Sequence, residues 1–186
     1  MRFIFIIVGL CWLLSEIFLN RLARSKNPDS KERDRGSMQL IWTAIIFSIP
    51  AGILCAIYIN ARISGTLILP WIGLALILAG MAIRFIAIRT LGRFFTVNLA
   101  IHPDQHIIQT GPYRYIRHPS YAGSLLSFLG FALTLDNWLS LAVIVIPVFA
   151  TFMNRILIEE KLLLQQFGQE YNEYMKGSGR LIPWVY

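Results

Sequence analysis

The sequence predicts an all-α integral membrane protein with five transmembrane helices. Hydrophobic residues make up 56% of its 186 residues and charged residues only 15%, and the mean hydropathy is +0.59. Soluble domains carry roughly 45–50% apolar and about 25% charged residues. A chain of this length forms a single domain. We therefore expect one membrane domain over residues 1–186, with any site built between its own helices and loops or across an oligomer interface.

Five apolar runs predict the helices, and each is long enough to cross or nearly cross a bilayer, whose core about 20 helical residues span. The runs are Phe3 to Leu19, Leu40 to Ile59, Leu67 to Ile83, Tyr121 to Leu135 and Trp138 to Met153. The first resembles the apolar core of a signal peptide. However, Ser15-Glu16-Ile17-Phe18 offers no small-residue cleavage site, so we interpret this run as a retained helix.

The last two runs are predicted to form a helical hairpin. Taken together, residues 121–153 are too long for one transmembrane helix, and a single helix would place Asp136-Asn137 in the middle of the bilayer. A tight turn at Asp136-Asn137 avoids that cost. The arms of the hairpin are short, so Pro119-Ser120 and residues 154–158 are expected to extend them as helix.

The distribution of basic residues predicts the orientation, because cytoplasmic loops are enriched in Lys and Arg. With five crossings, one side of the membrane holds only Arg2 and Arg62. The other side holds Arg21, Arg24, Lys26, Lys31, Arg33, Arg35, Arg89, Arg93, Arg114, Arg117, Arg155, Lys161, Lys176 and Arg180. We therefore expect the N-terminus outside and the C-terminus in the cytoplasm. The compact helix plan, without an organelle-retention sequence, suits a prokaryotic plasma (inner) membrane.

Charge and cysteine content exclude several other classes of function. The net charge of +7 is explained by topology and by attraction to anionic lipid headgroups, so we expect no nucleic-acid partner. Cys11 and Cys55 both lie in apolar runs and form no C-x-x-C pair. This favours neither a disulfide framework nor a thiolate metal site, and we expect no metal.

The segment from Thr90 to Pro119 predicts a cytoplasmic lid over the helix ends. It is longer than an ordinary connector, and it is too rich in apolar and aromatic residues for a disordered loop. The turn signals His102-Pro103-Asp104 and Thr110-Gly111-Pro112 divide it into short pieces that could pair as strands. Such a lid could enclose a cofactor.

A polar cluster at the entrance of the hairpin predicts a site. Pro119 is well placed as the first residue of a helix, whose free N–H groups favour a carboxylate or phosphate, and Arg117 would add a planar cation for the same group. The alternative is that Arg117 and His118 only reach toward lipid headgroups. The two ends of a hairpin are neighbours, so the residues expected to converge are His118, Tyr121, Arg155 and Glu159.

From Leu91 to Pro183 the sequence resembles the isoprenylcysteine carboxyl methyltransferases and the related phospholipid N-methyltransferases. The motifs that carry the resemblance are Gly111-Pro112-Tyr113, Arg117-His118-Pro119-Ser120-Tyr121, Glu159-Glu160-x-x-Leu163, Phe167-Gly168-x-x-Tyr171-x-x-Tyr174 and Arg180-Leu181-x-Pro183. We accordingly expect a three-helix N-terminal part, residues 1–89, and a methyltransferase-like catalytic part, residues 90–186.

The resemblance implies S-adenosylmethionine as cofactor and a lipid or lipidated substrate that enters from the bilayer. The residues that it implies for the cofactor are Asn98, Gln105, His106, Ile107, Ile108, Tyr113, His118, Pro119, Ser120, Tyr121 and Glu159. We expect the adjacent Arg117 and Glu160 to bind the cofactor as well. The substrate-side arginine of the family corresponds to Arg155, which we expect to be catalytic, and Arg180 is expected on the substrate side.

The acceptor and three alternative functions stay open at the level of the sequence. A carboxylate acceptor, such as that of a prenylated cysteine, is ionised at neutral pH and needs no general base. An amine headgroup would need one, for which Glu160 or His118 are candidates. The alternatives are a phospholipid or amine N-methyltransferase, an NADPH-dependent enzyme resembling the sterol reductases, and a non-catalytic lipid-binding module. The oligomeric state is not predicted.

Overall fold

The computed structural model describes residues 2–22, 36–66, 68–95 and 106–183, and all regular secondary structure within these ranges is helical. The elements are α1 (Arg2–Leu22), α3 (Ser37–Tyr58), α4 (Ile68–Leu91), the 3₁₀ turns η1 (Gly92–Phe94) and η2 (Gly111–Arg114), α5 (Pro119–Thr134), α6 (Trp138–Phe167) and α7 (Gln169–Gly177). Each of the five long helices, α1, α3, α4, α5 and α6, overlaps one of the five predicted apolar runs. The all-helical prediction is therefore confirmed for the described residues.

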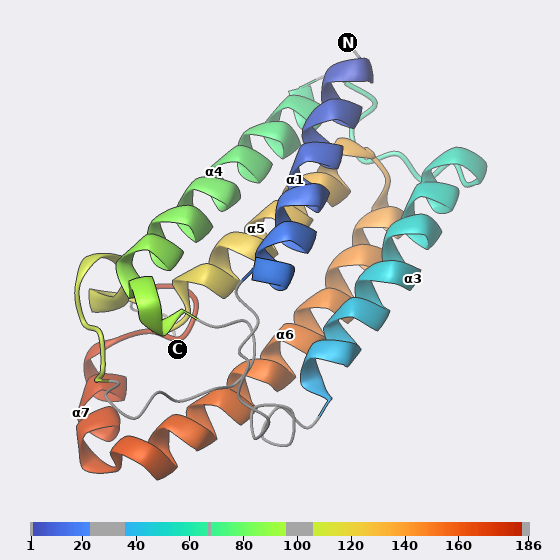
Figure 1. The fold of residues 1–186 in the computed structure, drawn as a ribbon. Helices are drawn as coiled ribbons and strands as arrows, with labels where there is room; N and C mark the ends of the chain where they lie inside the picture. The colour runs from blue at the N-terminus through green and yellow to red at the C-terminus, as the bar shows by residue number, and fades with distance from the viewer. Residues whose placement is uncertain (1, 23–35, 67, 96–105, 184–186) are drawn as a thin grey trace.

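The five long helices lie side by side as a bundle, with α4 packed along α5 and α3 packed along α6 (Figure 1). Within the described ranges, three stretches are long and apolar enough to cross a membrane, namely Ser37–Tyr58, Ile68–Phe94 and Trp138–Phe167. The helix α5 has 16 residues, and the apolar stretch of α1, Ile7–Leu19, is also shorter. Large apolar side chains are exposed on the bundle surface, as expected where lipid replaces water. Examples are Phe47, Ile46, Phe85 and Ile146.

The predicted hairpin is present and turns at Asp136-Asn137. The side chain of Asn137 caps α6 by accepting a hydrogen bond from the backbone N–H of Ser140 at 3.0 Å, and its amide donates to the carbonyl of Ile59 at 2.7 Å. The carboxylate of Asp136 accepts from the backbone N–H groups of Ser64 and Gly65, each at 2.9 Å. The turn thus ties the hairpin to the loop between α3 and α4.

Two pairs of glycines allow α4 and α5 to pack at close range. A Cβ atom on Gly73 would lie 2.5 Å from the carbonyl oxygen of Gly130, and a Cβ atom on Gly123 would lie 2.6 Å from that of Gly80. The two glycines on each helix are seven residues apart, which is about two turns, so they lie on the same face of that helix. Small residues at such contacts let membrane helices approach closely.

The structure differs from the sequence prediction at two places in the C-terminal half. The helix α6 continues to Phe167 rather than ending near residue 158, so its 30 residues extend about 45 Å, beyond the roughly 30 Å of a bilayer core. The described part of the predicted lid forms the turn η2 rather than paired strands. Its backbone makes a single parallel bridge, from Ile116 to Gly179. The residues 96–105 of the predicted lid lie outside the described ranges.

Candidate active site

A cavity of about 180 Å³ opens among the helices at the end of the bundle where α5 begins. Every long helix contributes to its wall, together with residues 106–108 and α7. One part of the wall is apolar and is formed by Leu13, Ile41, Trp42, Ile45, Phe128 and Phe152. Other lining residues are charged or are polar aromatic residues, among them Arg84, His118, Tyr121, Arg155 and Glu159. A cavity of this kind can hold one end of a ligand by charge and the other by apolar contact.

The motif Arg117-His118-Pro119-Ser120-Tyr121 lies at the start of α5, as the sequence predicts. Pro119 is the first residue of the helix, and its fixed φ suits that position. His118 precedes it, is 5% exposed, and donates its backbone N–H to the carbonyl of Arg180 at 3.1 Å. The rings of His118 and Tyr121 are stacked at 5.6 Å. The rings of His118 and Tyr121 therefore both form part of the cavity wall.

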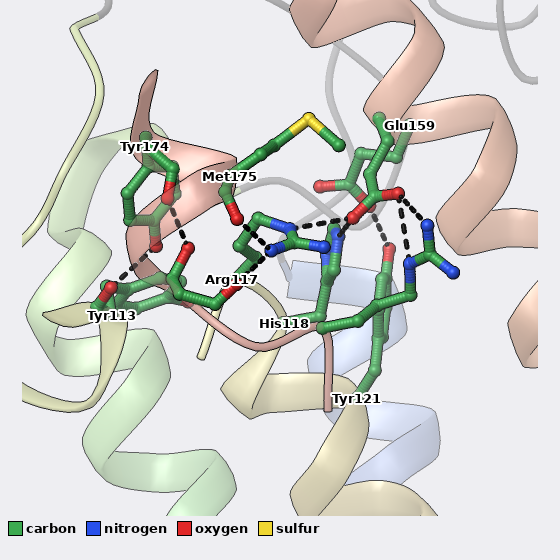
Figure 2. A network of polar contacts seen from close by, with 10 residues as sticks. Tyr113, Arg117, His118, Tyr121, Glu159, Tyr174 and Met175 are labelled. Atoms are coloured by element: carbon green, nitrogen blue, oxygen red, sulfur yellow. Dashed lines mark hydrogen bonds and ion pairs between the residues drawn. The ribbon is translucent and has the colours of Figure 1, made fainter. Parts of the chain in front are cut away.

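A chain of hydrogen bonds joins Arg155 to Glu159 through Tyr121. The Arg155 Nε atom donates to the Tyr121 hydroxyl oxygen at 3.0 Å. This hydroxyl donates to Glu159 Oε2 at 2.7 Å (Figure 2). Arg155 also donates from Nη1 to Ser37 Oγ at 2.7 Å and is only 1% exposed. The four residues expected to converge line one cavity. A cation and a carboxylate are therefore held side by side in it.

Glu160 lies in a different environment, between two arginines. It accepts a hydrogen bond from Arg117 Nε at 2.9 Å and two from Arg180, from Nε at 3.0 Å and from Nη2 at 2.8 Å. His118 Nε2 lies 3.4 Å from Glu160 Oε1. Arg117 also donates to the carbonyls of Met175 and Ser178 (Figure 2). We call Arg117, Glu160 and Arg180 the arginine clamp; it ties α6 to the entrance of α5 and to the end of α7.

The remaining predicted site residues divide between the cavity wall, the clamp and the undescribed region. His106, Ile107, Ile108, Tyr113, Arg117 and Ser120 line the cavity, whereas Pro119, Glu160 and Arg180 are not part of its wall. Asn98 and Gln105 lie outside the described residues. Tyr113 is buried, and burial raises the pKa of its phenol, so it stays protonated.

Several cavity residues were missed by the sequence reasoning. The guanidinium of Arg84 on α4 forms an ion pair with Glu16 on α1 at 3.1 Å, and it donates to Ser124 Oγ at 2.7 Å. Tyr171 and Tyr174 of α7 also line the cavity. A signal for the ion pair was present, because Glu16 lies within an apolar run and Arg84 at the edge of another, and charges in membrane helices commonly mark functional positions.

No group of three His, Cys, Asp or Glu residues that could hold a metal ion occurs within the described parts of the chain. The residues that line the cavity include cations, carboxylates and aromatic rings. Tyr174 illustrates how firmly some of these groups are fixed. Its hydroxyl donates to the carbonyl of Tyr113 at 2.6 Å, and the two residues face each other in Figure 2.

Comparison with known proteins finds similar methyltransferases. A probable protein-S-isoprenylcysteine O-methyltransferase of Oryza sativa subsp. indica is 38% identical over 117 residues, which is 62% of this chain and 61% of that protein. Protein-S-isoprenylcysteine O-methyltransferase of Saccharomyces cerevisiae is 36% identical over 116 residues, covering 61% of this chain and 48% of the yeast protein. The chain thus spans about half to three fifths of the length of these relatives. Both are eukaryotic and give no support to a prokaryotic plasma membrane.

A solved structure has a similar fold. It is that of a eukaryotic intramembrane Ras methyltransferase, isoprenylcysteine carboxyl methyltransferase. The similarity has a TM-score of 0.59 at 29% sequence identity and covers 87% of this chain and 54% of that one. It extends well beyond the C-terminal half in which the sequence motifs lie, so the N-terminal helices are part of the shared fold.

The model of one protein family, described as phospholipid methyltransferase, matches residues 68–170. The match covers more than half of the chain and includes α4, α5, all of α6 and the start of α7. It begins upstream of Leu91, where the motifs of the resemblance begin, and so adds α4 to the matched region. The resemblance to this group of membrane methyltransferases is confirmed, and the chain belongs to the phospholipid methyltransferase family.

Proposed function

We propose that the protein is an S-adenosylmethionine-dependent methyltransferase that methylates the carboxylate of a lipid-linked acceptor, such as a prenylated cysteine. The observation that carries the proposal is the series of hydrogen bonds from Arg155 through Tyr121 to Glu159, which holds a cation and a carboxylate at one cavity. The names of the similar proteins support the acceptor class. An integral membrane enzyme is the natural catalyst for such an acceptor, because its lipid part stays in the bilayer.

The cavity residues fit the functional groups of S-adenosylmethionine. The Glu159 carboxylate can accept hydrogen bonds from an ammonium group, and Arg117 and His118 can pair with a carboxylate. The aromatic part of the wall, which includes Tyr113 and Phe94, suits a flat base. When bound, this cofactor supplies a methyl group on a sulfonium, whose leaving group is already activated.

The work left to the protein is positioning and exclusion of water. Arg155 can orient an acceptor carboxylate through its planar guanidinium, and its burial strengthens that interaction. Tyr121 fixes Arg155 from one side and Ser37 fixes it from another. An ionised carboxylate attacks without losing a proton, so the arrangement needs no general base.

The apolar part of the cavity is proposed to hold the lipid part of the acceptor. Ile41, Trp42 and Ile45 of α3 line the same cavity as Phe128 and Phe152, with which they form one apolar cluster. Burial of an isoprenoid contributes about 0.8 kcal/mol for each buried methylene. The acceptor carboxylate would then lie at the boundary between the apolar wall and Arg155.

An amine headgroup is a second candidate acceptor, favoured by the description of the matching family as phospholipid methyltransferase. An amine must lose a proton during methylation, so this reaction needs a base at the cavity. His118 lines the cavity and is a candidate, whereas both oxygens of Glu160 are engaged by the arginine clamp. A carboxylate acceptor therefore fits the geometry more directly.

The membrane topology is part of the proposed function. We propose that all five long helices cross the membrane, with the N-terminus outside and the site on the cytoplasmic side. Residues 90–118 would form the lid, and the catalytic part, residues 90–186, would act on a substrate held against the three-helix part, residues 1–89. The positive charges at the cavity end of the bundle support this orientation.

The proposal is tested with purified protein in lipid nanodiscs and labelled S-adenosylmethionine. We expect label to enter a prenylated cysteine carboxylate and not an amine headgroup. Label in the amine would establish the second candidate. Thermal stabilisation by NADPH instead of S-adenosylmethionine would support the reductase, and stabilisation by neither would support a non-catalytic module.

The variant Arg155→Ala tests the role of the cation in the same assay. Turnover is expected to be lost while affinity for S-adenosylmethionine stays within about threefold, because the acceptor and not the cofactor needs Arg155. Arg155→Lys keeps the charge without the planar fork and should retain partial turnover. Normal turnover in Arg155→Ala, or loss of cofactor affinity with turnover preserved at saturation, would contradict the assignment.

A further inference from the structure

Two tyrosines on α7, one turn apart, differ in how their hydroxyl groups are satisfied. Tyr174 donates to the carbonyl of Tyr113 at 2.6 Å. Tyr171 is 2% exposed and lines the cavity, yet its buried hydroxyl has no hydrogen-bond partner among the described residues. Their rings lie 5.9 Å apart, so the difference arises between neighbours in one environment.

An unpaired buried hydroxyl needs an explanation, because most buried polar groups in proteins have a partner. Leaving such a group unpaired destabilises the folded state, whereas a ligand atom that accepts its hydrogen removes the cost. The group is also a dependable donor. Burial, together with the negative charges of Glu160 and Glu159, raises the pKa of Tyr171, so the phenol keeps its hydrogen at physiological pH.

The surroundings of Tyr171 indicate which part of a ligand it would meet. The same wall includes Leu163 and Phe167, four residues apart on α6, and the buried ring of Tyr113. Flat apolar surfaces of this kind suit a heteroaromatic base. The two nearby carboxylates disfavour a ligand carboxylate at this position, and they leave neutral acceptors such as ring nitrogens and ribose oxygens.

We infer that Tyr171 is a cofactor-binding residue whose hydroxyl donates a hydrogen bond to a neutral acceptor atom in the nucleoside half of S-adenosylmethionine. The inference rests on the proposed function for the identity of the cofactor. It assigns a role to the motif Phe167-Gly168-x-x-Tyr171-x-x-Tyr174, whose tyrosines carry no role in the sequence analysis.

The test compares Tyr171→Phe with the matched control Tyr174→Phe, in the absence and presence of ligand. Without ligand, Tyr171→Phe is expected to melt at or above the wild-type temperature, because it removes an unpaired polar atom. Tyr174→Phe should melt lower, because it breaks a bond within the protein. Tyr171→Phe should also bind S-adenosylmethionine and 5′-methylthioadenosine about fivefold to tenfold more weakly by calorimetry.

The two ligands separate the possible outcomes. 5′-Methylthioadenosine keeps the nucleoside and lacks the amino-acid end, so equal weakening for both ligands supports the nucleoside assignment. Weakening for S-adenosylmethionine alone, or unchanged affinity for both, overturns it. Failure of wild-type protein to bind S-adenosylmethionine would instead refute the proposed function.

A spectroscopic measurement keeps the inference testable if Tyr171→Phe does not fold. 3-Fluorotyrosine placed at position 171 is expected to shift its fluorine resonance when 5′-methylthioadenosine is added, whereas the same label at 174 should move much less. A resonance at 171 that does not move, or an equal shift at both positions, would overturn the assignment.

Discussion

Glu159 and Glu160 are neighbours in the sequence but lie in two different environments. Successive residues of a helix point about 100° apart, so only one of the two can face the cavity. Glu159 lines the cavity and accepts from Tyr121, whereas Glu160 lies in the arginine clamp. The sequence pair predicts two cofactor contacts, and both stay predictions. The structure shows that the two carboxylates lie in different surroundings, one at the cavity and one in the arginine clamp.

Glu159→Gln is expected to weaken S-adenosylmethionine binding by about tenfold to a hundredfold, because hydrogen bonds to charged groups are worth roughly 1.5–3 kcal/mol. The melting temperature without ligand should change little, since Glu159 is partly exposed at the cavity. Calorimetric titration measures the affinity. Unchanged affinity would show that Glu159 does not meet the cofactor's ammonium group.

Glu160→Gln is expected to lower stability by about 3 kcal/mol, because it leaves Arg117 and Arg180 buried with less negative charge to balance them. The side chain of Glu160 is 5% exposed, so solvent cannot compensate. Unfolding in mixed detergent micelles measures the loss. If Glu160→Gln is as stable as wild type but has lost its affinity for S-adenosylmethionine, Glu160 binds the cofactor and the structural role is contradicted.

At the scale of the helices, the hairpin was predictable because its signal is local. Asp136-Asn137 interrupts an apolar run, and Asn137 caps the helix that follows it. The end of α6 was not predictable in the same way. Residues 159–167 are polar enough to leave the membrane, and what keeps them helical is contact with α7 and the clamp, which no local pattern records.

Gly80→Ala tests the close packing of α4 against α5. The added methyl would collide with the Gly123 carbonyl and with Ser127, and overpacking of this kind costs about 1–3 kcal/mol. Gly9→Ala on α1 is the matched control, because its Cβ would lie 3.7 Å from the ring of Phe131, an ordinary contact. Thermal unfolding of both variants measures the difference. Equal stability of the two variants would rule out a tight α4 and α5 contact.

At the scale of the whole molecule, the basic residues gather at the cavity end of the bundle. Arg84, Arg117 and Arg155 lie there, whereas Arg62 lies at the opposite end beside Asn137. The helix order alternates direction along the chain (Figure 1). The arrangement of the helices therefore separates these described arginines as the sequence analysis expects.

Single cysteines placed at the two ends test this orientation and the number of crossings. In a background with Cys11 and Cys55 replaced by serine, Ser64→Cys should react with a membrane-impermeant maleimide in intact cells. Lys176→Cys should react only after permeabilisation. Three crossings separate the two positions if the hairpin spans the membrane, and two if residues 121–153 cross only once. Labelling of both from one side would contradict the hairpin.

Long-range contacts explain what the sequence could not predict about the site. Glu16 and Arg84 are 68 positions apart, and neither sequence neighbourhood identifies the other as its partner. Tyr171 belongs to a motif, but what suggests a role for it is its buried hydroxyl, which has no hydrogen-bond partner among the residues that the structure describes. By contrast, His118, Tyr121, Arg155 and Glu159 were predictable, because a hairpin necessarily brings its two ends together.

The pairing of the segment before α5 with the segment after α7 bears on how the protein is synthesised. Arg117 and His118 donate their backbone N–H groups to Gly179 and Arg180, and Glu160 is neutralised by Arg180. A nascent chain can therefore insert all its helices and still lack a finished cavity entrance until Arg180 has left the ribosome. A chain stalled before Gly179 would then be inserted in the membrane but would lack the hydrogen bonds that close this end of the cavity.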